Sequence, residues 1–218
     1  MPFEDAESQR RAAGEAAAAL VEDGMALGYG TGRAAQAALE ALARRGLRVR
    51  GVPTSERTAE LCRKLGLPLT TLDETPSLDL VLDGADEIDP EKQVLKGGGG
   101  AHVREKLVAL AARRRVFIVE EPKLVPRLGS TRGVPIAVVA FGWRATLARI
   151  DRMLPGSKAR EGRNDDGAVV VDAPIPATAD LRDLAAGVKA IPGVIDHGLF
   201  LDLAPEVVVG GRDGVRRL

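Results

Sequence analysis

Short apolar segments alternate with alanine-rich amphipathic segments up to about residue 127, and this alternation restricts the fold more than any other feature of the chain. It is typical of a mostly parallel sheet whose strands are joined by helices. Within 79–83, Leu80, Val81 and Leu82 follow one another without alternation, as in a strand buried on both faces. The pattern predicts helices at about 7–22, 34–45, 55–65 and 101–114, and strands at about 25–28, 49–52, 67–71, 79–83 and 116–119. We therefore expect an α/β fold with a Rossmann-like sheet and helices on both faces.

A second pattern begins after about residue 127. Strands are expected at 135–141, 168–172 and 194–200, with helices at 143–153 and 181–189 between them. This order is typical of a small α+β domain of the split-βαβ, ferredoxin-like type. Residues 206–218 offer one more strand and a helical turn. We expect a catalytic domain at 1–127, to which 203–218 returns, and a small domain at 128–202.

The composition excludes several classes of protein. Lysine and arginine total 31 residues, as do aspartate and glutamate, so the chain has no global positive field for nucleic acid. One tyrosine and one tryptophan leave little aromatic surface for stacking bases. No apolar run approaches the roughly 18 residues of a membrane helix, and the N-terminus lacks the apolar segment of a signal peptide. A single cysteine, Cys62, excludes an internal disulfide. We expect a soluble cytoplasmic protein that binds neither nucleic acid nor membrane.

A glycine-rich segment, residues 28–35 (GYGTGRAA), lies between a predicted strand and a predicted helix. Such a turn, together with the helix N-terminus, directs backbone N–H groups at an anion. The spacing also fits a loose dinucleotide fingerprint, but residues 52–54 (VPT) at the end of the next strand hold no acid for a ribose hydroxyl. No Gly-Lys-Ser/Thr follows, which excludes a nucleotide P-loop. The pattern favours a phosphate site over a turn that merely connects the two elements.

Acidic residues follow the most apolar strand, in the segment 83–89 (DGADEID). Ligands of open α/β sheets bind outside the carboxyl ends of the strands, so Asp83 and Asp86 are candidates for a site. We expect Glu87 and Asp89 to lie in a solvated acidic turn. A Mg²⁺ site is the alternative for such a cluster. Nearby lysines argue against it, and we expect no metal.

Four consecutive glycines lie between Lys96 and the helix that carries Glu105. Because such a run costs conformational entropy, its backbone is expected to approach a ligand closely. A carboxylate near N–H groups and a lysine suits abstraction of a proton beside a carbonyl. The alternative is that residues 104–106 (REK) form only a charged, exposed helix face. Lys123 lies at the end of the next strand, where a lysine is usually a surface residue. We interpret His102, His197 and Cys62 as structural.

Taken in order, these segments resemble the ribose-5-phosphate isomerase A family over nearly the whole chain. The resemblance is carried by GYGTGRAA, VPTSERT, LDLVLDGADEID, LKGGGGAHVREKLV, VEEPK, AIPGVIDHGLF and GGRDGV, and DGADE followed by KGGGG and REK is its most specific part. It implies that Glu105 is the proton acceptor and that Thr31 and Gly32 belong to the phosphate loop. It also implies a sugar site made by Asp83, Gly84, Ala85, Asp86, Lys96, Gly97, Gly98, Gly99 and Lys123.

The chain departs from the family pattern at the phosphate loop. Where the family has Gly-Thr-Gly-Ser-Thr, this chain has Arg33 and Ala34 in place of the last two residues. Arg33 either binds phosphate oxygens bidentately or blocks the loop and changes the substrate. His102 and Val103 stand where the family more often has leucine and threonine, and Glu120 stands where an aspartate is usual.

The resemblance implies a cofactor-free isomerase of the pentose phosphate pathway that forms a homodimer or homotetramer. As a hypothesis, Asp83 assists ring opening of ribose 5-phosphate, and Glu105 moves a proton from C2 to C1. Lys96 and the glycine N–H groups would stabilise the enediolate between these steps. One alternative is a non-catalytic protein that senses phosphorylated sugars. Another is an isomerase for a different phosphorylated sugar.

Overall fold

The computed structural model describes residues 5–218, which divide into two compact units. Unit 1 contains residues up to Ala85 together with Arg104–Leu124 and Leu203–Leu218, and unit 2 contains Asp86–Val103 and Val125–Asp202. The sequence pattern placed 86–103 in the first domain, whereas their contacts group them with the second unit. The chain therefore passes from one unit to the other four times.

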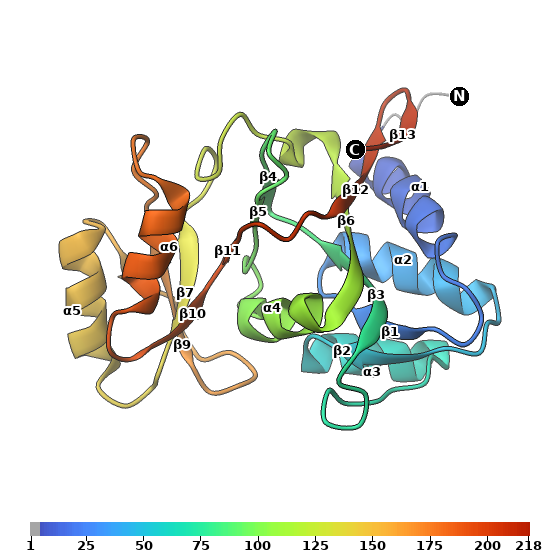
Figure 1. The fold of residues 1–218 in the computed structure, drawn as a ribbon, viewed down its shortest axis with the longest axis horizontal. Helices are drawn as coiled ribbons and strands as arrows, with labels where there is room; N and C mark the ends of the chain where they lie inside the picture. The colour runs from blue at the N-terminus through green and yellow to red at the C-terminus, as the bar shows by residue number, and fades with distance from the viewer. Residues whose placement is uncertain (1–4) are drawn as a thin grey trace. The chain divides into compact units, whose positions relative to one another are not determined.

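Unit 1 is built on a six-stranded sheet (Figure 1) with the strand order β13-β12-β6-β3-β1-β2. Its strands are β1 (Ala26–Tyr29), β2 (Arg50–Pro53), β3 (Leu78–Gly84), β6 (Ala112–Glu120), β12 (Glu206–Gly211) and β13 (Gly214–Arg217). All neighbouring pairs are parallel except β12 and β13. The chain moves from β1 outward to β2 and then returns to β3 on the other side of β1. The sheet therefore has a topological switch point between β1 and β3.

Helices cover both faces of this sheet: α1 (Ala6–Ala18), α2 (Arg33–Arg44), α3 (Glu56–Leu65) and α4 (His102–Ala111). Leu80 and Leu82 of β3 belong to the core that α1 and α2 complete. Side chains alternate between faces along a strand, so Val81 points to the other face. Val108 of α4 packs there, because both valines line the space beside Gly28. Unit 1 is a mostly parallel sheet between helical layers, as the alternating sequence pattern predicts.

The helix boundaries follow from local signals. The Asp5 carboxylate accepts the Ser8 N–H at 2.7 Å and begins α1, and the Ser55 hydroxyl accepts the Thr58 N–H at 3.1 Å and begins α3. Gly66, with φ of +71°, ends α3 in the left-handed conformation that glycine adopts without strain. These side-chain caps satisfy N–H groups that have no partner inside the helix.

Unit 2 contains a four-stranded antiparallel sheet with the order β10-β7-β9-β8. Its elements follow as β7 (Val134–Val138), α5 (Trp143–Met153), β8 (Lys158–Ala159), β9 (Val169–Ala173), α6 (Leu181–Lys189) and β10 (Val194–His197). Ile150 of α5 and Leu184 of α6 share one core with Ile136 and Val171 of the sheet, so both helices cover the same face (Figure 1). This β-α-β-β-α-β order confirms the expected ferredoxin-like domain.

A second, three-stranded sheet in unit 2 explains where residues 86–103 belong. β4 (Glu87–Ile88) pairs with β5 (Val94–Leu95), and β5 pairs with β11 (Leu199–Phe200). The Val125 N–H also donates to the Ile88 carbonyl at 2.9 Å. Pairing with β11, which lies about a hundred residues later, holds this segment in unit 2, and no local sequence signal reports such a contact.

Several predicted elements have other bounds. The expected strand at 67–71 is reduced to a single bridge between Gly51 and Leu69. The expected helix at 101–114 ends at Ala111, because the next residues enter β6. Residues 214–217 form β13 and not a helical turn. The strand expected at 194–200 divides at Gly198 into β10 and β11, which pair in different sheets. The sequence pattern does not predict the short strand β8.

Candidate functional site

The switch point of unit 1 brings together the turns that follow β1 and β3. Gly28 pairs with Val81 and Tyr29 with Leu82, and the Gly30 N–H donates to the Leu82 carbonyl at 2.9 Å. The two turns therefore start side by side, at the place where open α/β sheets bind ligands. Each carries a segment that the sequence singled out, residues 30–34 and 83–85.

Asp83 is buried, with 1% of its surface exposed, and it holds the two turns together. Its Oδ1 accepts the Thr31 N–H at 3.1 Å and the Gly84 N–H at 2.7 Å. A Cβ at Gly30 would lie 2.3 Å from that same Oδ1. Gly30 is therefore required by the close approach of the Asp83 carboxylate.

The Thr31 hydroxyl lies at the centre of a cluster of four hydroxyl groups. Its Oγ1 is 2.7 Å from Thr54 Oγ1, 2.8 Å from Ser55 Oγ and 3.0 Å from Thr58 Oγ1. Three partners are as many as one hydroxyl can serve with its single donor and two lone pairs. The cluster ties the turn after β1 to the start of α3, and it leaves the Thr31 hydroxyl little capacity for a ligand.

The helix α2 begins at the same turn without a side-chain cap. Gly32 is its N-cap residue, with φ of +111°, and no side chain accepts the first N–H groups of the helix. Arg33 is exposed and makes no hydrogen bond or ion pair with residues 5–218, whereas Ala34 is buried. Uncapped N–H groups beside a free guanidinium are suited to bind an anion.

A cavity of about 240 Å³ opens on this glycine turn within unit 1. Gly30 and Gly32 line it, together with the cationic side chains Arg57 and Lys64 and the acidic Glu60. The cavity is wide enough for a small polar group, and its two cations favour a negative one.

Glu105 lies in the first turn of α4, with 4% of its surface exposed. The buried position excludes the interpretation of Glu105 as part of an exposed charged face. Val108, one turn later on the same side of the helix, packs against β1 beside Gly28. Because α4 connects the parallel strands β3 and β6, it runs against the strand direction, and its first turn lies toward the carboxyl ends of the strands. Glu105 is thus held at the carboxyl edge of the sheet.

Lys123 ends η1 (Glu121–Lys123), which follows the carboxyl end of β6. Its side chain is half-buried and forms no hydrogen bond or ion pair with residues 5–218. Glu120, one residue before η1, is paired with Arg10 of α1 at 2.5 Å, and both side chains are only 12% exposed. Glu120 therefore has a structural partner in the same unit, while the Lys123 ammonium is available to an anion.

In unit 2, Lys96 enters the glycine loop, residues 97–100. Lys96 is 3% exposed, and its backbone N–H donates to the Gly198 carbonyl at 2.9 Å. The buried His102 ring lies against Gly97, since a Cβ there would be 2.8 Å from His102 Nδ1. Gly97 has φ of +104° and Gly100 has φ of +81°. The loop thus needs glycine at both ends for backbone conformation, and at Gly97 for space as well.

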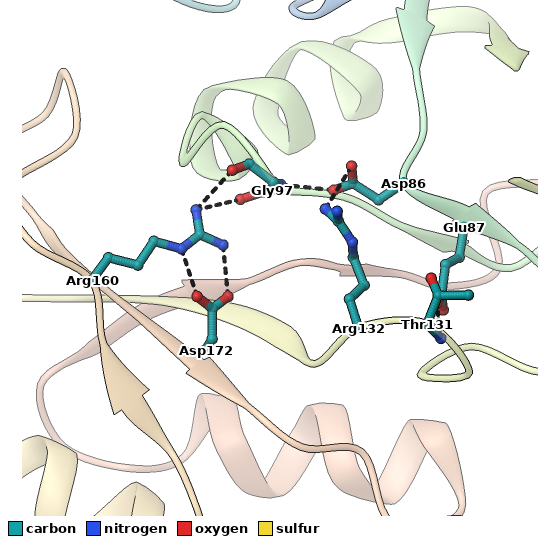
Figure 2. A network of polar contacts seen from close by, with 8 residues as sticks. Asp86, Glu87, Gly97, Thr131, Arg132, Arg160 and Asp172 are labelled. Carbon is teal, nitrogen blue, oxygen red and sulfur yellow. Dashed lines mark hydrogen bonds and ion pairs between the residues drawn. The ribbon is translucent and has the colours of Figure 1, made fainter. Parts of the chain in front are cut away.

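Asp86 contacts this loop directly (Figure 2). Its Oδ2 accepts the Gly98 N–H at 2.7 Å, and its Oδ1 pairs with the Arg132 guanidinium at 2.9 Å. A Cβ at Gly98 would lie 2.5 Å from Arg132 and 2.8 Å from Asp86. Asp86 and the glycine run, predicted separately, therefore form one structure, and Arg132 is a partner that the sequence did not indicate.

Arg160 contacts the same loop from the β8–β9 hairpin (Figure 2). One guanidinium nitrogen donates to the carbonyls of Gly97 and Gly98, each at 3.0 Å, and the other two nitrogens bind Asp172 at 2.6 and 2.7 Å. Sequence reasoning missed Arg160 and Asp172 because they lie sixty or more residues from the loop, in a region with no motif of its own.

The expectation that Glu87 lies in a solvated acidic turn is wrong. Glu87 is fully buried, and its carboxylate accepts the N–H groups of Gly129 and Thr131, each at 2.6 Å. It also accepts the Thr131 hydroxyl at 2.5 Å, and Figure 2 shows Glu87 and Thr131 together. Asp89 instead accepts the N–H groups of Glu91 and Gln93, and burial raises its pKa. Both acids shape loops of unit 2.

No group of three or more His, Cys, Asp or Glu side chains among residues 5–218 is arranged to hold a metal ion. Within the same residues, no helix has both the length and the apolar composition needed to cross a bilayer. Cys62 is fully buried, and burial raises the pKa of its thiol to about 12, in agreement with a core position.

Comparison with known proteins identifies the family of this chain. The family model for Ribose 5-phosphate isomerase A (phosphoriboisomerase A) matches residues 50–214. A Caulobacter vibrioides (strain NA1000 / CB15N) protein named ribose-5-phosphate isomerase A is 47% identical over 224 residues, which cover 98% of each chain. The structure of ribose 5-phosphate isomerase A from Methanocaldococcus jannaschii is 33% identical, with a TM-score of 0.92, and the match covers 97% of this chain and 98% of that one. A structure of D-ribose-5-phosphate isomerase in complex with phospho-erythronic acid is 32% identical, with a TM-score of 0.93, over 98% and 99% of the two chains.

Proposed function

Since the chain belongs to the ribose-5-phosphate isomerase A family, we propose that it interconverts D-ribose 5-phosphate and D-ribulose 5-phosphate in the pentose phosphate pathway. The observation that carries the mechanism is the position of Glu105, a buried carboxylate in the first turn of a helix at the carboxyl edge of the sheet. A carboxylate held there is suited to remove a proton from carbon and return it to the neighbouring carbon. Glu105 is the proposed base.

The reaction needs one base and no net change in charge. Glu105 removes the C2 proton of the open-chain aldehyde, which leaves a cis-enediolate with its negative charge on O1. The protonated Glu105 then delivers the proton to C1, while the hydroxyl proton of O2 passes to O1. C2 becomes the ketone and C1 the terminal alcohol. A single carboxylate serves both carbons when they present the same face to it.

The glycine loop supplies the proposed stabilisation of the enediolate, together with Lys96. Two of its N–H groups are already used, since Gly98 donates to Asp86 and Gly100 donates to the Gly97 carbonyl. The N–H of Gly99 has no acceptor among residues 5–218, and Gly99 is exposed. A fixed N–H group of this kind stabilises a developing oxyanion without reorganising during the reaction. Gly99 is the loop donor that we assign to the substrate.

Asp83 and Asp86 keep their proposed places in the sugar site, with roles refined by their contacts. Asp83 Oδ1 accepts the N–H groups of Thr31 and Gly84 in the turns after β1 and β3. We therefore assign the proposed role in ring opening to Oδ2. Asp86 is held by Gly98 and Arg132, which fixes its direction toward a sugar hydroxyl. Lys123, with no partner among residues 5–218, is available to hold the substrate.

We propose that the phosphate binds at the uncapped N-terminus of α2, with Arg33 as its cation. The saturated Thr31 hydroxyl then positions the loop through its neighbours. Gly32 and Ala34 contribute backbone N–H groups, and Arg33 replaces the lost hydroxyl donors with a bidentate one. The phosphate acts as a remote handle whose binding energy places C1 and C2 at Glu105.

Replacing Glu105 by Gln tests the base. The amide cannot accept a proton, so kcat for ribose 5-phosphate is expected to fall by about a thousandfold or more, while phospho-erythronic acid still binds within about threefold. Glu91→Gln, which changes an exposed glutamate, is the matched control and should keep wild-type kcat. Substantial turnover by Glu105→Gln would show that another group is the base.

Arg33→Ser, and its combination with Ala34→Thr, tests the phosphate site. If Arg33 binds the phosphate, the single change should raise the KM for ribose 5-phosphate by about tenfold or more, because a charge-assisted pair is lost. The double change, which restores the two hydroxyl donors, should recover most of that loss. An inert wild type with an active double variant would instead mean that the loop has diverged, and a panel of phosphorylated sugars would then identify the substrate.

We further propose a homodimer or a dimer of dimers that acts in the cytoplasm, where phosphorylated sugars are retained, without nucleic acid. Leu107 and Leu110 on one side of α4 are 53% and 57% exposed, and a second copy of the chain would cover such apolar side chains. Sedimentation equilibrium should give a mass of at least twice 22.9 kDa. Sedimentation as a monomer at micromolar concentration would contradict the oligomer.

A further inference from the structure

The glycine loop is held by side chains from one short segment of unit 2, residues 160–164. Arg160 donates to the carbonyls of Gly97 and Gly98, and Asn164 Nδ2 donates to the Gly100 carbonyl at 3.2 Å. Three of the four glycine carbonyls therefore point at this segment. A run of four glycines has little conformational preference of its own, so its geometry depends on such external contacts.

The Arg160 contacts determine where the N–H groups of the loop point. In a trans peptide the C=O and the following N–H lie on opposite sides of the chain. The Gly97 carbonyl is bound by Arg160, and the N–H of the same peptide points the other way, to Asp86 at 2.7 Å (Figure 2). The Gly98 carbonyl is also bound by Arg160, so the Gly99 N–H of that peptide must point away from the guanidinium as well.

We propose that Arg160 is a positioning residue for the isomerase reaction: it orients the peptide between Gly98 and Gly99 so that its N–H is presented to the enediolate oxygen. This inference rests on the proposed function. Without Arg160, the carbonyl of this peptide loses the contact that fixes its direction, and the glycines on either side have little conformational preference of their own. The oxyanion donor would then be present but no longer aligned.

Asp172 fixes the guanidinium in turn. Arg160 N–H bonds to the Val170 carbonyl at 2.8 Å, which places Arg160 and Asp172 as diagonal neighbours on one face of the β8–β9 hairpin. The bidentate pair restrains the guanidinium plane so that its remaining nitrogen faces both glycine carbonyls. Side-chain exposures of 27% for Arg160 and 44% for Asp172 indicate that the pair contributes little to the stability of the fold.

Arg160→Gln and Arg160→Lys in the full chain test the proposal against Arg163→Gln, a control at an exposed arginine without a hydrogen bond or ion pair to residues 5–218. For Arg160→Gln we expect kcat to fall by about 10- to 100-fold with KM changed by less than about threefold, because the lost interaction acts on the transition state. Binding of phospho-erythronic acid, whose carboxylate imitates the enediolate oxygens, should weaken in parallel with kcat/KM. The lysine variant should recover only part of the loss, since an ammonium cannot bind Asp172 bidentately and both carbonyls as well.

Asp172→Asn leaves Arg160 in place, so it tests the proposal even if the Arg160 variants fail to fold. It should lower kcat by about 3- to 10-fold at an unchanged melting temperature. Variants with wild-type kcat, or a loss confined to KM, overturn the positioning role. A wild-type chain without isomerase activity overturns the proposed function itself, so the two failures are distinguishable.

Discussion

Individual residues at the carboxyl edge of unit 1 show how close packing sets the identity of single positions. Gly30 has no room for a Cβ because the buried Asp83 carboxylate lies against it. Gly51 has none because the Tyr29 ring lies across it, with a Cβ-to-Cζ distance of only 2.3 Å. At these two positions a neighbouring side chain leaves no room for a Cβ. At Gly32 the requirement is conformational, because φ is +111°.

Tyr29→Phe is expected to leave the protein as stable as the wild type or slightly more stable. The Tyr29 hydroxyl is fully buried and has no hydrogen-bond partner among residues 5–218, and burial raises its pKa. Removing an unsatisfied polar group recovers its desolvation cost, about 1 kcal/mol. Urea unfolding measures the effect.

Thr54→Val is the matched control, because the Thr54 hydroxyl donates to the Tyr29 carbonyl and contacts Thr31 Oγ1. It should lower the free energy of unfolding by about 1–2 kcal/mol. A clear loss of stability in Tyr29→Phe would reveal a partner for the tyrosine hydroxyl.

At the scale of elements, helix starts divide into those capped by a side chain and those that begin at a glycine. Asp5, Ser55 and Asp180 cap α1, α3 and α6, whereas α2 begins at Gly32 and α5 at Gly142 without a side-chain cap. A helix of twelve residues with uncapped N–H groups is less stable by itself than a capped one. The uncapped start of α2, which lies at the carboxyl edge of the unit 1 sheet, is the one that we propose to bind the phosphate.

The Asp180 cap predicts a pH dependence for α6. Hydrogen bonds from the N–H groups of Asp183 and Arg182 lower the pKa of Asp180 below its ordinary value. The charged form therefore stabilises the folded state above about pH 3.8, and this contribution is lost as pH falls through the lowered pKa. NMR titration of the carboxyl carbon should give a midpoint below that of an aspartate that accepts no hydrogen bonds.

Asp180→Asn keeps a capping oxygen and removes the titration. Its urea midpoint should differ from that of the wild type at pH 6, and this difference should change between pH 5 and pH 2. A parallel pH dependence of the two proteins would contradict the assignment of Asp180.

At the scale of the whole molecule, each unit has a hydrophobic core of its own, one around Leu82 and the other around Ile136. Because the chain passes between the units four times, some of the proposed site residues belong to unit 1 and the others to unit 2. Thr31, Asp83, Glu105 and Lys123 belong to unit 1, whereas Asp86, Lys96 and the glycine loop belong to unit 2.

The balance of 31 basic and 31 acidic residues predicts a solubility minimum near pH 7. A net charge of zero removes the long-range repulsion that keeps copies apart. Precipitation by polyethylene glycol at low ionic strength should require the least precipitant near pH 7 and more at pH 5 and pH 9. A flat profile would mean that local surface patches, and not net charge, control association.

The sequence by itself determined the α/β class, the ferredoxin-like second domain, the family and the segments in which the proposed site residues lie, because periodicity and short motifs are local properties of the chain. Only the tertiary structure decided that residues 86–103 group with unit 2, that Glu87 is buried, and that Arg132 and Arg160 hold the glycine loop. These facts depend on hydrogen bonds and strand pairs between residues tens to a hundred positions apart. Such contacts leave no periodic trace in the sequence, since a single arginine anywhere in a loop can supply them.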